Sequence, residues 1–235
     1  MPNSFSRSAF FSEPFRLMQQ KFVSHLAQAA MYSIPPSLAY LVIAESLKFH
    51  AIQFYRHNST VAINAQARGK VEQAYKNMGC ENKEIYFCDV GFDFPHALTS
   101  VIDPKGVLFA CGQPRTEEAY NELYAMAGHE ALHTKENHAV KSEFAFFMLW
   151  EMMREMSFAC LQMRTMTVFC GTFLCAAALS AQMNKALEYR ADAVSAKKLH
   201  TEPELCRLFH RHPKDGGLGY PSFESREANL HRLDY

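Results

Sequence analysis

The stretch from Ala127 to His133 reads Ala-Gly-His-Glu-Ala-Leu-His, and the interpretation of the whole chain starts from it. It places His129 and His133 four residues apart, with Glu130 directly after the first histidine. Residues four apart lie on one face of an α-helix, so the two imidazoles can hold one Zn²⁺ ion. Glu130 can then reach a water molecule that the metal activates and can act as general base. The alternative is an amphipathic helix whose histidines face solvent.

The residues before this motif favour a helix. Glu117 to Leu132 is rich in good helix formers, and Thr116 is a suitable N-cap for it. Glu117 and Glu118 stand in the first turn, where negative charge is favourable. The pattern therefore predicts that both histidines lie on one helix.

A catalytic zinc site of this kind needs a third protein ligand. Metzincins have a glycine three residues after the second histidine and a third histidine six residues after it, but Glu136 and Ala139 occupy these positions. His138 stands one residue early, and the register of a continuing helix points it elsewhere. A di-iron carboxylate bundle needs two Glu-x-x-His units, and the chain has only Glu130 to His133. Both alternatives fail.

A later helix offers the missing ligand. The segment from Lys185 to Lys198 is strongly helical by composition and places Glu188 and Asp192 on one face. Glu188 could complete a site of two histidines and one glutamate that leaves a fourth position open for water. Asp192 could accept a hydrogen bond from the far nitrogen of a ligating histidine. Taken alone the segment is an exposed helix with mixed charges, but with the first motif it predicts His129, His133 and Glu188 as metal ligands.

Three segments resemble the HtpX-like and CAAX prenyl endopeptidase group of zinc metallopeptidases, which are gluzincins. Residues 127–133 resemble its His-Glu-x-x-His helix, and residues 188–192, Glu-Tyr-Arg-Ala-Asp, resemble its Glu-x-x-Ala-Asp segment. Residues 220–230 resemble its C-terminal His-Pro-x-x-x-x-Arg-x-x-x-Leu stretch. Order and spacing agree from about Gly106 onward. The resemblance implies a zinc-dependent endopeptidase that acts on protein or peptide substrates.

The third segment departs from the family pattern at one position, because Tyr220 stands where the family has histidine. The resemblance implies that a histidine or tyrosine at the edge of the site donates a hydrogen bond to the tetrahedral oxyanion, which a phenol can also do. His212 lies eight residues earlier and is the second candidate, although its distance from Arg226 does not match the pattern. Arg226 matches the family arginine, so the resemblance places it near the site.

Composition bounds the class and the compartment of the protein. The 235 residues are 49% hydrophobic and 20% charged with a formal net charge of zero, which suits one large domain or a domain with an extension. The balanced charge and the lack of Lys or Arg runs give no reason to expect a nucleic-acid partner. Seven irregularly spaced cysteines without a Cys-x-x-Cys motif indicate a reducing compartment, so we expect a cytoplasmic protein, with membrane association as a further option. The oligomeric state is not indicated.

We predict an α+β fold that is predominantly helical. A zincin-like metallopeptidase domain over residues 59–235 carries a small β-sheet beside the metal-binding helix, and residues 1–58 form a helical extension. In the extension, helices over Pro14–Met31 and from Ser37 to about Tyr55 are separated by Pro35-Pro36. The apolar run from Leu38 to Ala44 is too short to cross a bilayer.

The strands are expected between the extension and the metal-binding helix. Asn64 to Gly79 reads as a helix, and Glu84–Val90 and Gly106–Gly112 read as strands. We expect Val107–Cys111 to be an edge strand beside the metal, on which an extended peptide could pair. An ordinary buried strand is the equal alternative.

Two apolar stretches, residues 141–163 and 165–184, follow the metal-binding helix. The second has no charged residue and is nearly long enough to span a membrane. Because His133 and Glu188 must meet at one metal, the chain between them crosses a membrane either twice or not at all. The first stretch carries Glu151, Arg154 and Glu155, each costing about 2.5–3.5 kcal/mol at a bilayer centre. We therefore expect two helices that are buried or lie on a membrane surface.

The segment after His200 is expected to be loop-rich as far as Tyr220, with a closing helix over Glu224–Leu233. The function hypothesis is a zinc metalloendopeptidase in which Glu130 is the general base. The alternative is a non-catalytic protein that retains the protease fold and binds zinc or a membrane surface.

Overall fold

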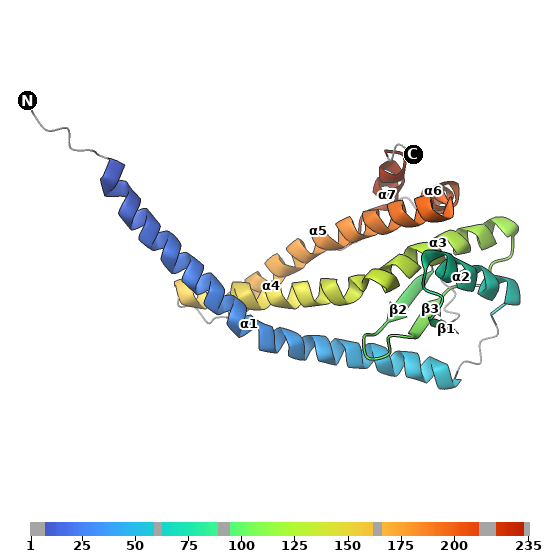
Figure 1. The fold of residues 1–235 in the computed structure, drawn as a ribbon, viewed down its shortest axis with the longest axis horizontal. Helices are drawn as coiled ribbons and strands as arrows, with labels where there is room; N and C mark the ends of the chain where they lie inside the picture. The colour runs from blue at the N-terminus through green and yellow to red at the C-terminus, as the bar shows by residue number, and fades with distance from the viewer. Residues whose placement is uncertain (1–7, 59–62, 89–94, 162–165, 212–219, 233–235) are drawn as a thin grey trace, which may run out of the picture.

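The computed structural model describes residues 8–58, 63–88, 95–161, 166–211 and 220–232 (Figure 1). This part of the chain is mostly helical with one small sheet, which confirms the predicted α+β class. The elements in chain order are α1 (Ser8–Asn58), α2 (Ala65–Met78), β1 (Glu84–Cys88), β2 (His96–Thr99), β3 (Gly106–Ala110), α3 (Glu117–Glu136), α4 (His138–Leu161), α5 (Met166–Leu199), α6 (Glu202–Arg211) and α7 (Phe223–Leu230).

The sheet has the order β1-β3-β2, with β1 parallel to β3 and β2 antiparallel to it. β3 therefore pairs on both sides, and the prediction that Val107–Cys111 is an edge strand is wrong. Its side chains are buried almost without interruption, which is typical of a central strand. The edge beside α3 is formed by β2, a short strand that the sequence analysis did not identify.

The two faces of the sheet pack against different helices. Phe109 points into the main core, which β1 and β3 share with α2 and α3. Leu108, the neighbouring residue, points to the opposite face and packs with Ile52 of α1. This alternation is the two-residue period of a strand that is covered on both sides. The end of α1 thus packs on the sheet, while the domain boundary between residues 58 and 59 stays a prediction.

Helix α1 runs continuously through Pro35-Pro36, so the predicted break into two helices is wrong. An internal proline costs about 3 kcal/mol because it removes a backbone donor and crowds the preceding turn. Packing along α4 opposes this cost, for example where the ring of Tyr40 stacks on Phe147 at 5.0 Å between centroids. The prolines bend the helix and do not end it, and α1 changes direction near its middle (Figure 1).

The ends of α2 and α3 follow the predicted signals. The side chain of Asn64 caps α2, which ends at Gly79 with φ 81°. The hydroxyl of Thr116 accepts a hydrogen bond from the backbone N–H of Ala119 and caps α3. Helix α3 ends at Asn137, which has the left-handed conformation with φ 53°. Both predicted helices are confirmed.

The C-terminal part contains one helix that the sequence analysis missed. Helix α6 lies inside the segment predicted to be loop-rich, because Leu205, Leu208 and Phe209 are buried in a second core that includes residues of α3. Helix α7 confirms the predicted closing helix as far as Leu230, and Leu233 lies outside the described residues.

Helices α1 and α5 flank α4 (Figure 1). Much of the apolar surface of α1 and α5 is uncovered. Of the two alternatives expected for residues 165–184, burial does not hold for most of α5, and a position on a membrane surface stays a prediction. Within the part of the chain that the structure describes, two helices are long and apolar enough to cross a membrane, Val23–His57 and Met166–Leu199. Only 17% and 22% of their most apolar windows are buried. The exposed large apolar side chains of these helices are Val23, Leu26, Met31, Tyr32, Ile34, Leu38, Val42, Ile43, Leu47, Phe54, Met166, Phe169, Phe173, Leu174, Leu179 and Met183.

Candidate metal centre

Helices α3 and α5 approach each other closely at Gly128. A Cβ atom at this position would collide with the side chain of Leu199 and lie 3.7 Å from the Cβ of Ser195. The residue that follows, His129, is thereby brought against the face of α5 that carries Glu188 and Asp192. The absence of a side chain at residue 128 thus helps to set the spacing of the site.

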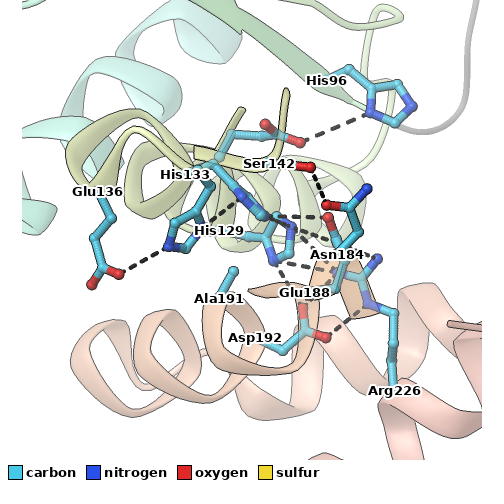
Figure 2. A network of polar contacts seen from close by, with 12 residues as sticks. His96, His129, His133, Glu136, Ser142, Asn184, Glu188, Ala191, Asp192 and Arg226 are labelled. Carbon is cyan, nitrogen blue, oxygen red and sulfur yellow. Dashed lines mark hydrogen bonds and ion pairs between the residues drawn. The ribbon is translucent and has the colours of Figure 1, made fainter. Parts of the chain in front are cut away.

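The structure brings the three predicted ligands together between these helices (Figure 2). The Nε2 atoms of His129 and His133 are 3.0 Å apart. The carboxylate of Glu188 lies 3.2 Å from the first of these nitrogens and 3.4 Å from the second. Ligands about 2.0–2.1 Å from a tetrahedral zinc ion are about 3.3 Å from one another. The three side chains therefore have the chemistry and the spacing of a zinc site.

The electrostatics of the site also favour a cation. Glu130, Glu188 and Asp192 bring three carboxylates into one buried region, and Arg226 supplies one positive charge. Without a metal, burial and the charge of Arg226 oppose protonation of His129, but hydrogen bonds to Asp192 and Glu188 outweigh them and raise its pKa to about 9. The proton on His129 then supplies one positive charge where a metal ion would supply two. A divalent ion would balance the two negative charges that Arg226 leaves.

Asp192 and Arg226 lie behind the ligands. A carboxylate oxygen of Asp192 is 2.9 Å from Nδ1 of His129, so the Nε2 atom of that ring faces the other ligands. Arg226 donates to both oxygens of Asp192, at 2.7 and 2.6 Å, and its Nη1 is 3.3 Å from Glu188. Its guanidinium also stacks on the ring of Phe209 at 4.4 Å. Arg226 is buried, and it contacts the ligand shell and lines the cleft from behind the ligands.

Glu130 lies on α3 next to the ligands and faces β2. The backbone N–H of Ala97 donates a hydrogen bond to its carboxylate, and Nδ1 of His96 lies 3.9 Å away. Both contacts come from the strand that the sequence analysis missed. The segment around His96 is short and follows a proline, so its pattern gives little signal for a strand.

His138 lies against the second ligand, which corrects the expectation that the helical register points it elsewhere. Its Nδ1 atom is 2.9 Å from Nδ1 of His133. The helix does not continue past α3 in one register, because Asn137 interrupts it with a left-handed residue. The chain therefore turns back toward the ligand before α4 begins.

A cleft of about 720 Å³ opens over the ligands, large enough for several residues of a peptide. Tyr220 lines this cleft together with Glu130 and Arg226, and the tyrosine side chain is largely exposed. The second candidate for the oxyanion donor, His212, lies outside the described residues.

A second group of side chains could also hold an ion. Glu202, Cys206 and His231 have ligand atoms within 4.8 Å of one another, between α6 and the end of α7. His231 is exposed and the other two are partly exposed, whereas His129 and Glu188 are buried. The first group alone combines burial, a neighbouring carboxylate base and the cleft.

Residues 106–211 match the model of peptidase family M48, a little under half of the 235-residue chain. The match includes α3 and α5 with His129, His133 and Glu188, and it ends before Tyr220 and Arg226. It supports the M48 metallopeptidase family, whose members are metal-dependent peptidases that act on proteins or peptides. The chain matches no curated protein and no solved structure.

Because the carboxyl of Glu130 is buried, we predict that the unfolding free energy of the metal-free protein falls as the pH rises. Burial raises its pKa from 4.5 to about 7, so its contribution to stability is full below pH 4.5 and is lost as the pH rises through about 7. Glu130→Gln removes this titration. Between pH 5 and pH 8 we expect the variant to gain about 2 kcal/mol in unfolding free energy relative to the wild type.

Chemical denaturation in the presence of a chelator measures this difference. Glu118→Gln, at an exposed position of the same helix, is the matched control and should follow the wild-type pH dependence. If the unfolding free energies of wild type and Glu130→Gln changed with pH in parallel, burial would not raise the pKa of this carboxyl.

Proposed function

We propose that this chain is a zinc-dependent metalloendopeptidase of family M48, most similar to the HtpX-like and CAAX prenyl endopeptidase group. The observation that carries the proposal is the convergence of His129, His133 and Glu188 at tetrahedral spacing beside an open cleft. The family match over the same helices supports it independently.

The zinc ion would be held by His129, His133 and Glu188. When bound, zinc activates water and polarises the carbonyl of the scissile peptide bond. Asp192 fixes the ring of His129 so that Nε2 points inward. Arg226 holds Asp192 and Glu188 in place and acts through them, without touching the substrate.

Glu130 is the general base in this mechanism. Its carboxylate lies beside the ligands and is oriented by the backbone N–H of Ala97. It takes a proton from the attacking water and passes it to the leaving amine as the peptide bond breaks. Burial raises the proton affinity of this carboxylate, which suits a group that must both accept and return a proton near neutral pH.

The substrate peptide pairs with β2 in this proposal. β2 is the sheet edge beside α3, and one of its residues contacts the general base. Apart from the N–H of Ala97, which contacts Glu130, backbone groups at a sheet edge can pair with an extended peptide, independently of its side chains. This mode of binding favours unfolded or extended segments as substrates.

The Glu130→Gln variant tests the mechanism. We expect hydrolysis of an unfolded protein such as casein to fall by at least about 10²-fold, because the transfer of the proton is lost. Zinc should remain bound at one ion per chain, since Glu130 is not a ligand. Hydrolysis at the wild-type rate would remove Glu130 from the mechanism, and wild-type chain that binds zinc without cleaving any substrate would favour the non-catalytic alternative.

Tyr220 is our candidate for the oxyanion donor, because its phenol lies at the rim of the cleft that Glu130 lines. Tyr220→Phe removes only the hydroxyl. We expect kcat to fall by about 10²–10³-fold with little change in KM, as for the loss of one oxyanion donor. Tyr32→Phe, at an exposed position of α1, is the control. An unchanged kcat would assign the oxyanion to another group.

We further propose that α1 and α5 associate with a membrane. Residues 22–44 contain no Asp, Glu, Lys or Arg, and because α1 is continuous they form about 34 Å of uncharged helix, enough for a bilayer core of about 30 Å. The first 19 residues of α5 are also free of these charges. In α4, Arg154 lies 2.6 Å from Glu151 and 3.1 Å from Glu155, so it offsets one of these two negative charges.

Flotation with phospholipid vesicles tests this association. We expect the full chain to float with neutral phosphatidylcholine vesicles and to stay bound at high salt, since the exposed faces are apolar. The double substitution Val42→Glu and Leu174→Glu should release it, because a charge within the bilayer core costs about 2.5–3.5 kcal/mol or more. A monodisperse wild-type chain that remains in the aqueous fraction would contradict the proposal.

A further inference from the structure

His138 is a buried histidine that the mechanism above does not use. It is the first residue of α4, its relative exposure is 2%, and it lies directly behind the ligand His133. The left-handed residue Asn137 turns the chain so that His138, five residues after the ligand, comes back to contact it. A buried polar side chain in this place needs a defined set of hydrogen bonds.

The partners of His138 determine where its proton lies. Nε2 of His138 is 2.9 Å from Oε2 of Glu136, and a carboxylate can only accept. Nε2 therefore carries a proton, and an imidazole with one proton on Nε2 has Nδ1 as its acceptor. Since that Nδ1 is 2.9 Å from Nδ1 of His133, the ligand must be the donor in this hydrogen bond. His133 is then left with a free lone pair on Nε2, the atom that faces Glu188.

Glu136 is fixed in turn from the surface of the protein. Arg190 of α5 donates to both of its oxygens, through Nε at 3.0 Å and Nη2 at 2.8 Å. This two-point contact keeps Glu136 ionised and in one orientation. Donation thus runs from His133 to His138 and from His138 to Glu136, and Glu136 also accepts from Arg190.

We propose that His138 is a positioning residue that fixes the tautomer and ring orientation of His133 for zinc binding. The inference rests on the proposed function, in which His133 is a zinc ligand. It parallels the contact of Asp192 with His129, and each arrangement ends on an arginine. The difference is that a neutral imidazole, and not another carboxylate, contacts His133. The second ligand is therefore oriented without adding a further negative charge to the buried site.

Zinc affinity of the full chain, measured by competition with a chromophoric chelator, tests the proposal. His138→Phe keeps the size of the ring and removes the acceptor, and we expect its dissociation constant for zinc to rise about 10–100-fold. His138→Asn places an amide oxygen near the position of Nδ1 and should recover most of the affinity. His210→Phe, at an exposed histidine of α6, is the control and should bind zinc like the wild type.

A second variant covers the case in which His138→Phe does not fold. Arg190→Met acts at a side chain that is 56% exposed, so it leaves the core intact while it releases Glu136. We expect a smaller but measurable loss of zinc affinity. If wild-type chain binds zinc and both His138→Phe and Arg190→Met bind it equally well, the positioning role is wrong while the proposed function stands. If wild-type chain binds no zinc, the proposed function fails, and the inference fails with it.

Discussion

The structure depends on the balance of charge in the buried space between α3 and α5. Glu130, Glu188 and Asp192 are all buried there, and a buried carboxylate is tolerated only when it is paired. Arg226 offsets one of these charges, and a divalent cation among His129, His133 and Glu188 would offset the rest. The close approach of the helices at Gly128 and the stacking of Arg226 on Phe209 keep these groups at ligand spacing.

Local patterns in the sequence predicted the parts of the site that lie on regular helices. The cap at Thr116, the end of α2 at Gly79 and the four-residue spacing of His129 and His133 depend on a few neighbouring residues, and each agrees with the structure. The placement of Glu188 required two segments to be considered together, because a carboxylate on a mixed-charge helix says little alone. Its position beside both histidines agrees with the ligand set inferred from the sequence.

The features that were missed depend on tertiary contacts or on single residues with unusual backbone angles. β2 is short, and it is defined by its pairing with β3 more than by its own pattern. The position of His138 follows from the left-handed angle at Asn137, which no hydrophobic period records. Helix α1 continues through its prolines because it packs against α4, whereas the sequence Pro35-Pro36 alone predicts the end of a helix. The apolar faces of α1 and α5 became visible only when the structure showed which residues remain uncovered.

Absorption spectroscopy at the zinc edge, on full chain loaded with one equivalent of zinc, tests the central claim most directly. A site made by His129, His133 and Glu188 predicts nitrogen and oxygen neighbours at about 2.0–2.2 Å, with imidazole scattering from two rings. A sulfur neighbour at about 2.3 Å would place the metal at a cysteine instead, as in the group of Glu202, Cys206 and His231. That result, or a failure to bind zinc at all, would contradict the account.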